Sequence, residues 1–155
     1  MTKSSVKRVL QAEYSLLCIG HALKQKFDDL AVDSGSGASK IPKFYFNFEN
    51  SIFGELVSSL NSSGGESGRC LPHSHFIATL LLPCSILDEK IRKFTGNDDM
   101  GDANDHITKA VHAFTHFTAL YTHKNIILCD LQGMLDHNKV MCLIDPQGHT
   151  YVFIS

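Results

Sequence analysis

The sequence predicts an α+β domain of ordinary globular composition. Two segments repeat apolar residues every three or four positions, as helices do when one face is buried, and several short apolar runs between turns have the pattern of strands. These helices and strands do not alternate regularly, which favours α+β over a doubly wound parallel sheet. The 155 residues are about one domain, and the 43% apolar content is that of a chain with a core.

The first predicted element is a helix over residues 5–27. Apolar side chains recur along it at helical spacing and define the face that we expect to pack on a sheet. Most charged residues, including Lys7 and Lys24, are predicted to lie off this face. The expected buried stripe is Val9, Ala12, Leu16, Ile19, Leu23 and Phe27.

Loops and short strands are predicted after this helix. Residues 33–40 form a Ser/Gly-rich connector, and 44–49 alternate like a half-buried strand. The glycines of 61–69 are also found in phosphate-binding loops, but no Gly-Lys-Ser/Thr follows them, so a surface loop is the better interpretation. Residues 73–95 are predicted to form two extended segments that bend near Pro83.

The second half predicts another helix and a set of strands. A turn-rich loop over 95–105 ends at Asn104 or Asp105, either of which can cap a helix. That helix is expected to fade near 116–118, with 118–123 extended. Apolar runs at 125–130 and 140–145, joined by a polar loop over 136–139, and a last run at 150–155 predict strands. The helix would bury Ile107, Ala110, Val111 and Phe114.

Charge and cysteine usage exclude several classes of protein. A formal charge of −2 gives no broad positive field, so we expect neither nucleic acid nor a membrane surface as partner. No apolar stretch approaches the ~20 residues of a membrane helix, and the start of the chain lacks the apolar core of a secretory signal. The five cysteines are scattered, which favours a reducing, cytoplasmic location.

One short phrase occurs twice. Apolar runs end at Asp130 and Asp145, and each aspartate is followed two positions later by glutamine, Gln132 and Gln147, and then glycine. Residues i and i+2 of an extended segment point to the same side, so an aspartate and an amide could present two oxygens together. Such oxygens suit Mg²⁺ bound to a nucleotide phosphate. Ordinary turns are the alternative, because Asp-Pro and Gln-Gly are common turn pairs.

Nine histidines raise the question of a metal site. His112 and His116 stand four apart on a predicted helix, a separation that lets two imidazoles share an ion. Structural zinc requires four ligands, and no cysteine pair lies nearby to complete the set. Packing inside the domain, with a hydrogen bond, is therefore the favoured interpretation of His116.

The segment "AVHAFTHFTALYTHKNIILCDLQGMLDHNKVMCLIDPQGHT", residues 110–150, resembles the core of the alpha-type protein kinase family, the atypical serine/threonine kinases. The family pattern is A-F-[ST]-H-[FW]-T, then D-[LI]-Q-G about fourteen residues after its histidine, then D-P-Q. Residues 90–97 are similar to the Lys-Tyr-Asn-Asn stretch of the family, and 8–27 resemble its long regulatory helix. The resemblance covers about two-thirds of the chain.

The resemblance implies a partial two-lobed kinase-like domain, with a long N-terminal helix and an antiparallel sheet, that transfers the γ-phosphoryl of ATP to a protein serine or threonine. By position in the motifs, Asp130 would orient the accepting hydroxyl, with Asp145 as the second catalytic acid. Gln132 and Asp145 would hold Mg²⁺ on ATP, and Lys93 would contact the nucleotide. His116 corresponds to one ligand of the family's structural zinc.

The resemblance also has departures. Residues 1–155 are expected to be a single alpha-kinase-like domain without the family's lysine-bearing strands, glycine-rich loop and remaining zinc ligands. Zinc is therefore not expected, and ATP and Mg²⁺ are the implied cofactors. The spacing from Asp130 to Asp145 is longer than is usual in the family. The alternative is an inactive pseudokinase remnant that binds nucleotide or another protein. The identity of the protein substrate is not written in the sequence.

Overall fold

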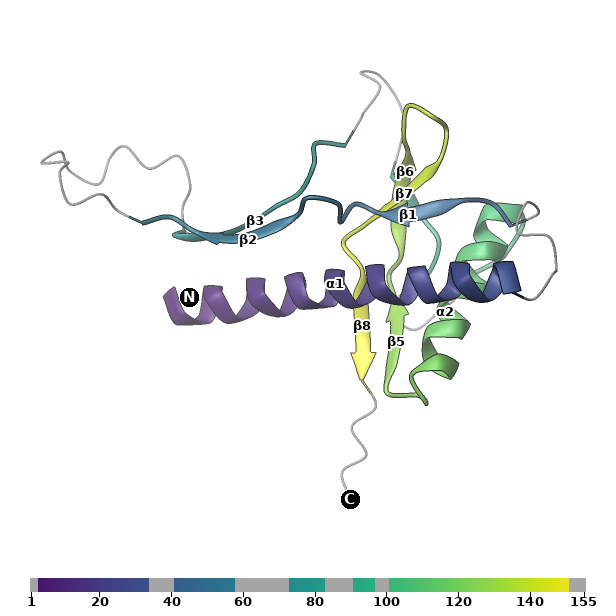
Figure 1. Ribbon diagram of the computed structural model, residues 1–155, viewed down its shortest axis with the longest axis horizontal. Coiled ribbons are helices and arrows are strands. Elements are labelled where there is room, and N and C mark those ends of the chain that lie inside the picture. The colour runs from purple at the N-terminus through teal and green to yellow at the C-terminus, as the bar shows by residue number, and fades with distance from the viewer. Residues whose placement is uncertain (1–2, 34–40, 58–72, 83–90, 97–100, 151–155) are drawn as a thin grey trace, which may run out of the picture.

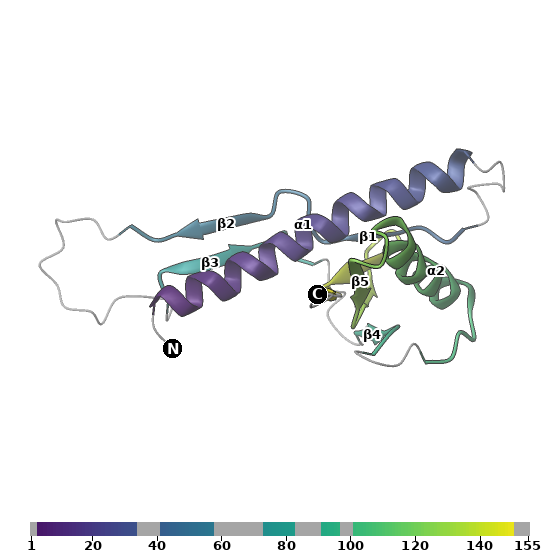
Figure 2. The same cartoon turned by 90° about the horizontal axis from the view of Figure 1, so that it is seen from below.

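The computed structural model describes residues 3–33, 41–57, 73–82, 91–96 and 101–150. A long helix, α1, crosses the whole molecule (Figure 1), and two regions lie along it. The strands β2 and β3 follow its N-terminal half, whereas β1, β4 to β8 and the second helix α2 gather around its C-terminal half (Figures 1 and 2). We call these the arm (residues 3–15, β2 and β3) and the body (β1, β4–β8 and α2).

The helix α1 spans Lys3–Asp33, longer at both ends than predicted. Its predicted buried stripe is partly wrong, because Val9 and Ile19 are 45% and 37% exposed while Lys24 is 6% exposed. The Lys24 ammonium lies 4.3 Å from the centre of the Phe44 ring and 2.6 Å from Asp28 Oδ1, and these contacts compensate its burial. The residues of α1 that are buried are Val6, Leu17, Gly20, Leu23 and Lys24.

The first three strands divide between the body and the arm. The predicted strand at 44–49 is confirmed as the shorter β1, Phe44–Phe46, with its two phenylalanines buried and Tyr45 exposed. In the arm, β2 (Ile52–Glu55) pairs antiparallel with β3 (His75–Ala78), which confirms one of the two extended segments predicted over 73–95. The strand β2 was not predicted, because the alternation of apolar and polar residues was seen only over 44–49.

The helix α2 spans His106–Tyr121 and begins where the sequence indicated. Asp105 is the cap, since its side chain accepts hydrogen bonds from the backbone N–H groups of Ile107 and Thr108. The predicted fading near 116–118 is wrong. The Thr118 hydroxyl is buried, donates to Thr115 O at 2.8 Å and accepts from Leu128 N at 3.2 Å, so this threonine joins the helix to the next strand.

The remaining strands form two sheets. The four-stranded sheet has the order β1-β7-β6-β4 and contains β4 (Arg92–Lys93), β6 (Gln132–Leu135) and β7 (Met141–Ile144). It is mixed rather than antiparallel throughout, because β1 runs parallel to β7. The second sheet pairs β5 (Ile126–Cys129) with β8 (Gln147–Thr150).

The core lies in the body and is rich in phenylalanine. Phe114 is fully buried, and its ring centre lies 5.5 to 5.9 Å from those of Phe27, Phe44 and Phe46. The core members that α1 supplies, Leu17 and Leu23, come from the middle of the helix and the part that follows it. Within the described ranges, no residue of the arm belongs to this core cluster, so the arm depends on smaller contacts such as the hydrogen bond from Tyr14 Oη to Ser51 O at 3.1 Å.

Four predictions fall wholly or largely on residues that the structure does not describe: the connector at 33–40, the loop at 61–69, the bend at Pro83, and the last strand beyond Thr150. The described cysteines Cys18, Cys129 and Cys142 are free thiols, and the last two are buried. No helix in the described segments is both long and apolar enough to cross a membrane.

Candidate active site

The repeated phrase of the sequence forms the two halves of one interrupted hairpin. Cys129 pairs with Gln147, and Gln132 pairs with Ile144, so β5–β8 and β6–β7 share one continuous register. Between them each chain makes a break of two residues, 130–131 on one side and 145–146 on the other. The two breaks lie opposite each other, which explains why the sequence repeats there.

Both aspartates have left-handed backbone conformations at these breaks. The φ angle is 50° at Asp130 and 47° at Asp145. Aspartate enters this region more readily than most residues do. The expectation that Asp130 and Gln132 share one side of an extended segment is therefore wrong in its reason, because the chain turns at Asp130 and begins a new strand at Gln132.

The break at Asp130 is filled by residues 92–96. Asp130 N donates to Gly96 O at 3.2 Å, and Phe94 N donates to Leu131 O at 2.8 Å. The Thr95 hydroxyl accepts from Leu131 N at 2.9 Å. These bonds satisfy backbone groups that the interrupted hairpin leaves unpaired, and they fix the position of the aspartate.

A charge pair forms at the same place. Lys93 Nζ lies 2.5 Å from Asp130 Oδ1, at an angle outside that of a directed hydrogen bond. The Asp130 residue is 9% exposed, whereas the Lys93 side chain is 57% exposed and reaches in from the surface. Burial, and then the neighbouring Asp130 charge, raise the pKa of the Cys129 thiol. The Asp130 carboxylate is thus paired with a lysine that reaches it from the surface.

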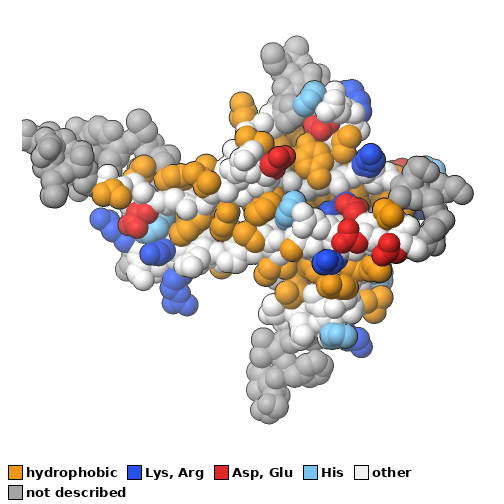
Figure 3. Space-filling view, in the orientation of Figure 1, with side chains coloured by type: hydrophobic (Ala, Val, Ile, Leu, Met, Phe, Trp, Pro, Cys, Tyr) orange, Lys and Arg blue, Asp and Glu red, His pale blue; other side chains and the backbone are white. Residues whose placement is uncertain are grey.

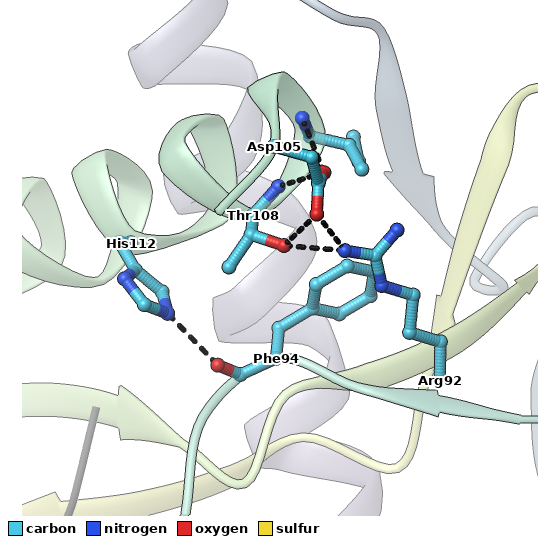
Figure 4. A network of polar contacts seen from close by, with 6 residues as sticks. Arg92, Phe94, Asp105, Thr108 and His112 are labelled. Carbon is cyan, nitrogen blue, oxygen red and sulfur yellow. Dashed lines mark hydrogen bonds and ion pairs between the residues drawn. The ribbon is translucent and has the colours of Figure 1, made fainter. Parts of the chain in front are cut away.

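A polar network attaches β4 to the start of α2 (Figure 4). Arg92 bonds to both Asp105 and Thr108, and its guanidinium lies 5.0 Å from the centre of the Phe94 ring. His112 Nε2 lies 2.8 Å from Phe94 O, where it donates a hydrogen bond. The backbone N–H of Thr108, and then Arg92, lower the pKa of Asp105 to about 2. This network holds the strand that carries Lys93.

Asp145 lies in a different environment from Asp130. It is exposed and lines a cavity of about 520 Å³ between the arm and the body. Apolar side chains such as Leu17, Ile77 and Leu80 form much of the wall, and Glu13 adds a second carboxylate. Asn47 Nδ2 donates to Leu80 O at 3.0 Å and so fixes one part of the rim. Such a cavity has the size and the mixed lining of a small-molecule site.

The structure brings some of the predicted site residues together and separates others. Lys93 contacts Asp130 and pairs along the strand with Gln132. Asp145 lies in the opposite break. The expectation that His116 packs inside the domain is wrong, because this side chain is exposed on α2. Glu13 and Asn47 could not be predicted as lining residues, because α1, the segment after β1 and other elements distant in sequence meet at the cavity. No spacing within one element indicates that meeting.

The donor set at these aspartates suits some metal ions and not others. No group of three or more histidine, cysteine, aspartate or glutamate side chains in the described part of the chain could hold a metal by itself. Asp145 pairs with no cation among the described residues, so its carboxylate oxygens can accept a ligand. The cavity lining offers the carboxylates of Asp145 and Glu13 and the side chain of Asn47, whereas Gln132 is not among its lining residues. Such oxygens suit Mg²⁺ that brings phosphate oxygens and water with it, and do not suit a cage made by protein alone.

Comparisons with known proteins agree on one family. The sequence model of the alpha-kinase family matches residues 37–152. Similar solved structures include the alpha-kinase domain of myosin-II heavy chain kinase A in complex with AMP-PNP, at 23% identity and a TM-score of 0.56. A catalytic domain mutant of that kinase shares 24% identity with a TM-score of 0.57, and a complex with AMP shares 23% with 0.53.

The structural matches cover 92% of this chain and 45%, 45% and 47% of the three kinase chains, in the same order. This chain therefore spans less than half the length of the domains it resembles. At these identities the structural likeness concerns the fold. No curated protein sequence matches the chain.

Proposed function

Because this chain belongs to the alpha-kinase family, we propose that it takes part in transferring the γ-phosphoryl group of ATP to a serine or threonine hydroxyl of a protein. One observation carries the proposal. Two aspartates occupy facing breaks of one hairpin, one paired with a lysine and the other lining a cavity. Phosphoryl transfer needs one group that positions the accepting hydroxyl and another that helps to neutralise the phosphates, and the two aspartates could fill these two roles.

The nucleotide is proposed to occupy the cavity between the arm and the body. The base would lie against Leu17, Ile77 and Leu80, and the phosphates would lie toward Asp145. Asp145, and Gln132 by its place in the family motif, would hold Mg²⁺, which neutralises charge on the phosphate oxygens when it is bound. The AMP-PNP and AMP complexes of the myosin-II heavy chain kinase A domain support a nucleotide site in this fold.

Asp130 is proposed to orient the accepting hydroxyl. Its backbone is fixed by residues 94–96, so its carboxylate is preorganised, and Lys93 balances its charge before substrate arrives. The exposed stem of Lys93 lets its ammonium contact a phosphate oxygen as well. The transition state of phosphoryl transfer is loose, so correct placement of the hydroxyl matters more than the basicity of Asp130.

Phosphate transfer tests the proposal directly. The purified chain is incubated with Mg²⁺, radiolabelled ATP and dephosphorylated casein, and incorporation is compared with that of Asp130→Asn and Asp145→Asn. Asparagine is the right replacement because it also tolerates a left-handed backbone, whereas alanine would add strain. We expect each variant to lose at least about 100-fold of the rate.

The matched control is Asp102→Asn, at an exposed aspartate of the loop before α2, which should leave the rate unchanged. Absence of transfer by the parent chain, or transfer that Asp145→Asn does not diminish, would refute the kinase proposal.

Nucleotide binding is a separate prediction. Mg²⁺-ATP should raise the melting temperature of the chain, because a ligand that binds only the folded state stabilises it by about 2.7 kcal/mol at 100 times its Kd. The rise should be smaller in Asp145→Asn and intact in Asp102→Asn. Differential scanning fluorimetry measures it, and equal rises in both variants would place the nucleotide elsewhere.

The proposal also assigns the chain to the cytoplasm, a reducing compartment that supplies ATP. The free thiols of Cys18, Cys129 and Cys142 support this assignment. Fractionation of cells expressing a tagged chain would test it.

A further inference from the structure

One face of the helix α1 is exposed to solvent along most of its length. Positions spaced alternately four and three residues apart are all exposed on this face: Arg8, Ala12, Ser15, Ile19, Ala22, Lys26, Asp29 and Asp33. An average spacing of 3.5 residues is that of the seam along which two helices pack in a coiled coil. At 1.5 Å per residue the face is about 38 Å long. We call these residues the α1 seam.

The middle of the α1 seam is uncharged and allows another helix to come close. Ile19 is 37% exposed although its side chain is large and apolar. Ala22, the next seam residue, presents only a methyl group. The Ser15 hydroxyl donates to Gln11 O at 2.8 Å within the helix, so it needs no partner from outside. Helices with such small side chains at the contact pack with their axes about 8–10 Å apart.

The two ends of the α1 seam carry opposite charges. Arg8 lies near the N-terminal end and Asp33 lies in the last turn, and neither makes an ion pair among the described residues. Lys26 and Asp29 differ from them, because they pair with each other at 3.6 Å. Figure 3 shows Lys and Arg side chains gathered mainly at the N-terminal end of α1, and Asp and Glu side chains mainly toward its C-terminal end.

This order of charges is the reverse of the one that the helix dipole favours. The first turn of α1 has no acidic residue and the last turn has no basic residue. Cations near the N-terminus and carboxylates near the C-terminus both interact unfavourably with the dipole of their own helix. A second helix that runs in the opposite direction would place its acidic end beside the basic end of α1, and so would supply the missing compensation at both ends.

We propose that two copies of this chain pair antiparallel along the α1 seam. With Ile19 of one copy packed on Ala22 of the other, the same register places Arg8 opposite Asp33, and two-fold symmetry makes each contact occur twice. A parallel pair would instead place Arg8 against Arg8. Glu13, which lines the cavity proposed for the nucleotide, is not a seam residue, so pairing leaves that cavity open. The inference does not depend on the kinase function.

Sedimentation equilibrium of the full chain at low salt tests the pairing. We expect a reversible equilibrium between monomer and dimer with a Kd of about 1–100 µM, because only one large apolar side chain of each copy lies at the centre of the contact. Added salt should weaken the dimer, since the charged ends of the seam are exposed. A chain that stays monomeric up to about 300 µM would overturn the proposal.

Ile19→Glu tests the centre of the seam. A charge there would lie beside the second copy, so we expect the Kd to rise at least about tenfold. Glutamate is a good helix former, and circular dichroism checks that the fold is kept. The matched control is Leu120→Glu, at a residue of α2 that is 72% exposed, and it should change the Kd less than twofold. Equal effects of the two variants would refute the contact at Ile19.

A charge swap tests the direction of pairing. Arg8→Asp and Asp33→Arg should each raise the Kd at least about tenfold, because two attractions become two repulsions. The double variant restores opposite charges at facing positions and should return the Kd to within about threefold of that of the parent chain. Lys109→Asp, at an exposed position of α2, makes the same change of net charge as Arg8→Asp and should have less than a twofold effect. A double variant as weak as the single variants would refute the antiparallel register.

All of these measurements are made without ATP. A monomeric chain that transfers phosphate would therefore overturn the pairing alone, and a dimer that transfers none would overturn the kinase proposal alone.

Discussion

Asp130 and Asp145 occupy equivalent positions in the sequence and have nearly equal φ angles of 50° and 47°, yet their surroundings differ. Residues 92–96 cover the first, so it is buried beside a lysine. The second faces a cavity and stays exposed. The repeated motif is explained by the backbone turn that both aspartates make. The two aspartates differ in burial and charge environment because different residues pack against each turn.

The glycine after Gln132 is required by the close approach of two strands. A Cβ on Gly133 would lie 2.2 Å from Cys142 O and 2.9 Å from Cys142 C, both backbone atoms of the paired strand. Because neither can move without separating the hairpin, Gly133→Ala should destabilise the fold by about 2 kcal/mol or more. Urea denaturation followed by circular dichroism gives the change in the free energy of unfolding.

Gly20→Ala is the matched control, because its Cβ would lie 3.5 Å from Phe46 Cζ, an ordinary contact. Alanine is the better helix former, so this variant should gain about 0.5–1 kcal/mol. If Gly133→Ala were as stable as the parent chain, the strand spacing described for β6 and β7 would be wrong.

At the level of elements, the sequence predicted those whose signals are local. Asp105 caps α2 as expected, because a cap acts on N–H groups two and three residues ahead. The end of α2 was predicted too early, because threonine is a β-branched residue that favours strands. In the structure, the buried Thr118 hydroxyl bonds both within the helix and to β5, and this keeps the residue helical. The strands β6 and β8 were missed because each begins at the glutamine of Asp-x-Gln, and such polar residues before a glycine are typical of turns.

The candidate site could likewise be predicted from the sequence only where its signals are local. Asp130, Gln132 and Asp145 were found from motifs within one stretch of chain. The pairing of Lys93 with Asp130 depends on β4 lying beside β6, which is a contact between distant segments. The stripe of α1 was misjudged at Lys24 for a related reason: its burial depends on the ring of Phe44 and on Asp28.

The cap of α2 predicts an acid dependence of stability. The pKa of Asp105 is lowered from its usual 3.8 to about 2 in the folded chain, so its contribution is complete above pH 4 and is lost as the pH falls from about 4 to 2. Asp105→Asn keeps a side-chain oxygen for the cap and removes the charge that faces Arg92. We expect this variant to melt several degrees lower at pH 7 and to approach the parent chain near pH 2.

Melting curves of both proteins between pH 7 and pH 2 provide the measurement. A difference that stays constant over this range would mean that the Asp105 charge contributes nothing to the folded state.

On the scale of the whole molecule, the arm and the body differ in how they are stabilised. The phenylalanine core belongs to the body, whereas the arm exposes large apolar side chains, among them Ile52 at 53% and Val9 at 45%. Apolar side chains are visible along this region in the space-filling view (Figure 3). Segments with few buried contacts open at lower free energy than the core, so we expect amides of β2 and β3 to exchange with solvent faster than those of β6 and β7.

The cavity that Asp145 lines connects the two regions, since Glu13 and Ile77 belong to the arm and Ile144 to Asp145 belong to the body hairpin. If nucleotide binds there and opening of the arm abolishes binding, Mg²⁺-ATP at 100 times its Kd should slow amide exchange in β2 and β3 by up to about 100-fold. Hydrogen exchange with mass spectrometry measures this effect, and β6–β7 serves as the internal reference because it already belongs to the stable body. In Asp145→Asn the slowing at the same ATP concentration should shrink with the loss of affinity, whereas Asp102→Asn should retain it. Saturable ATP binding that left exchange in the arm unchanged would show that the nucleotide contacts the body alone.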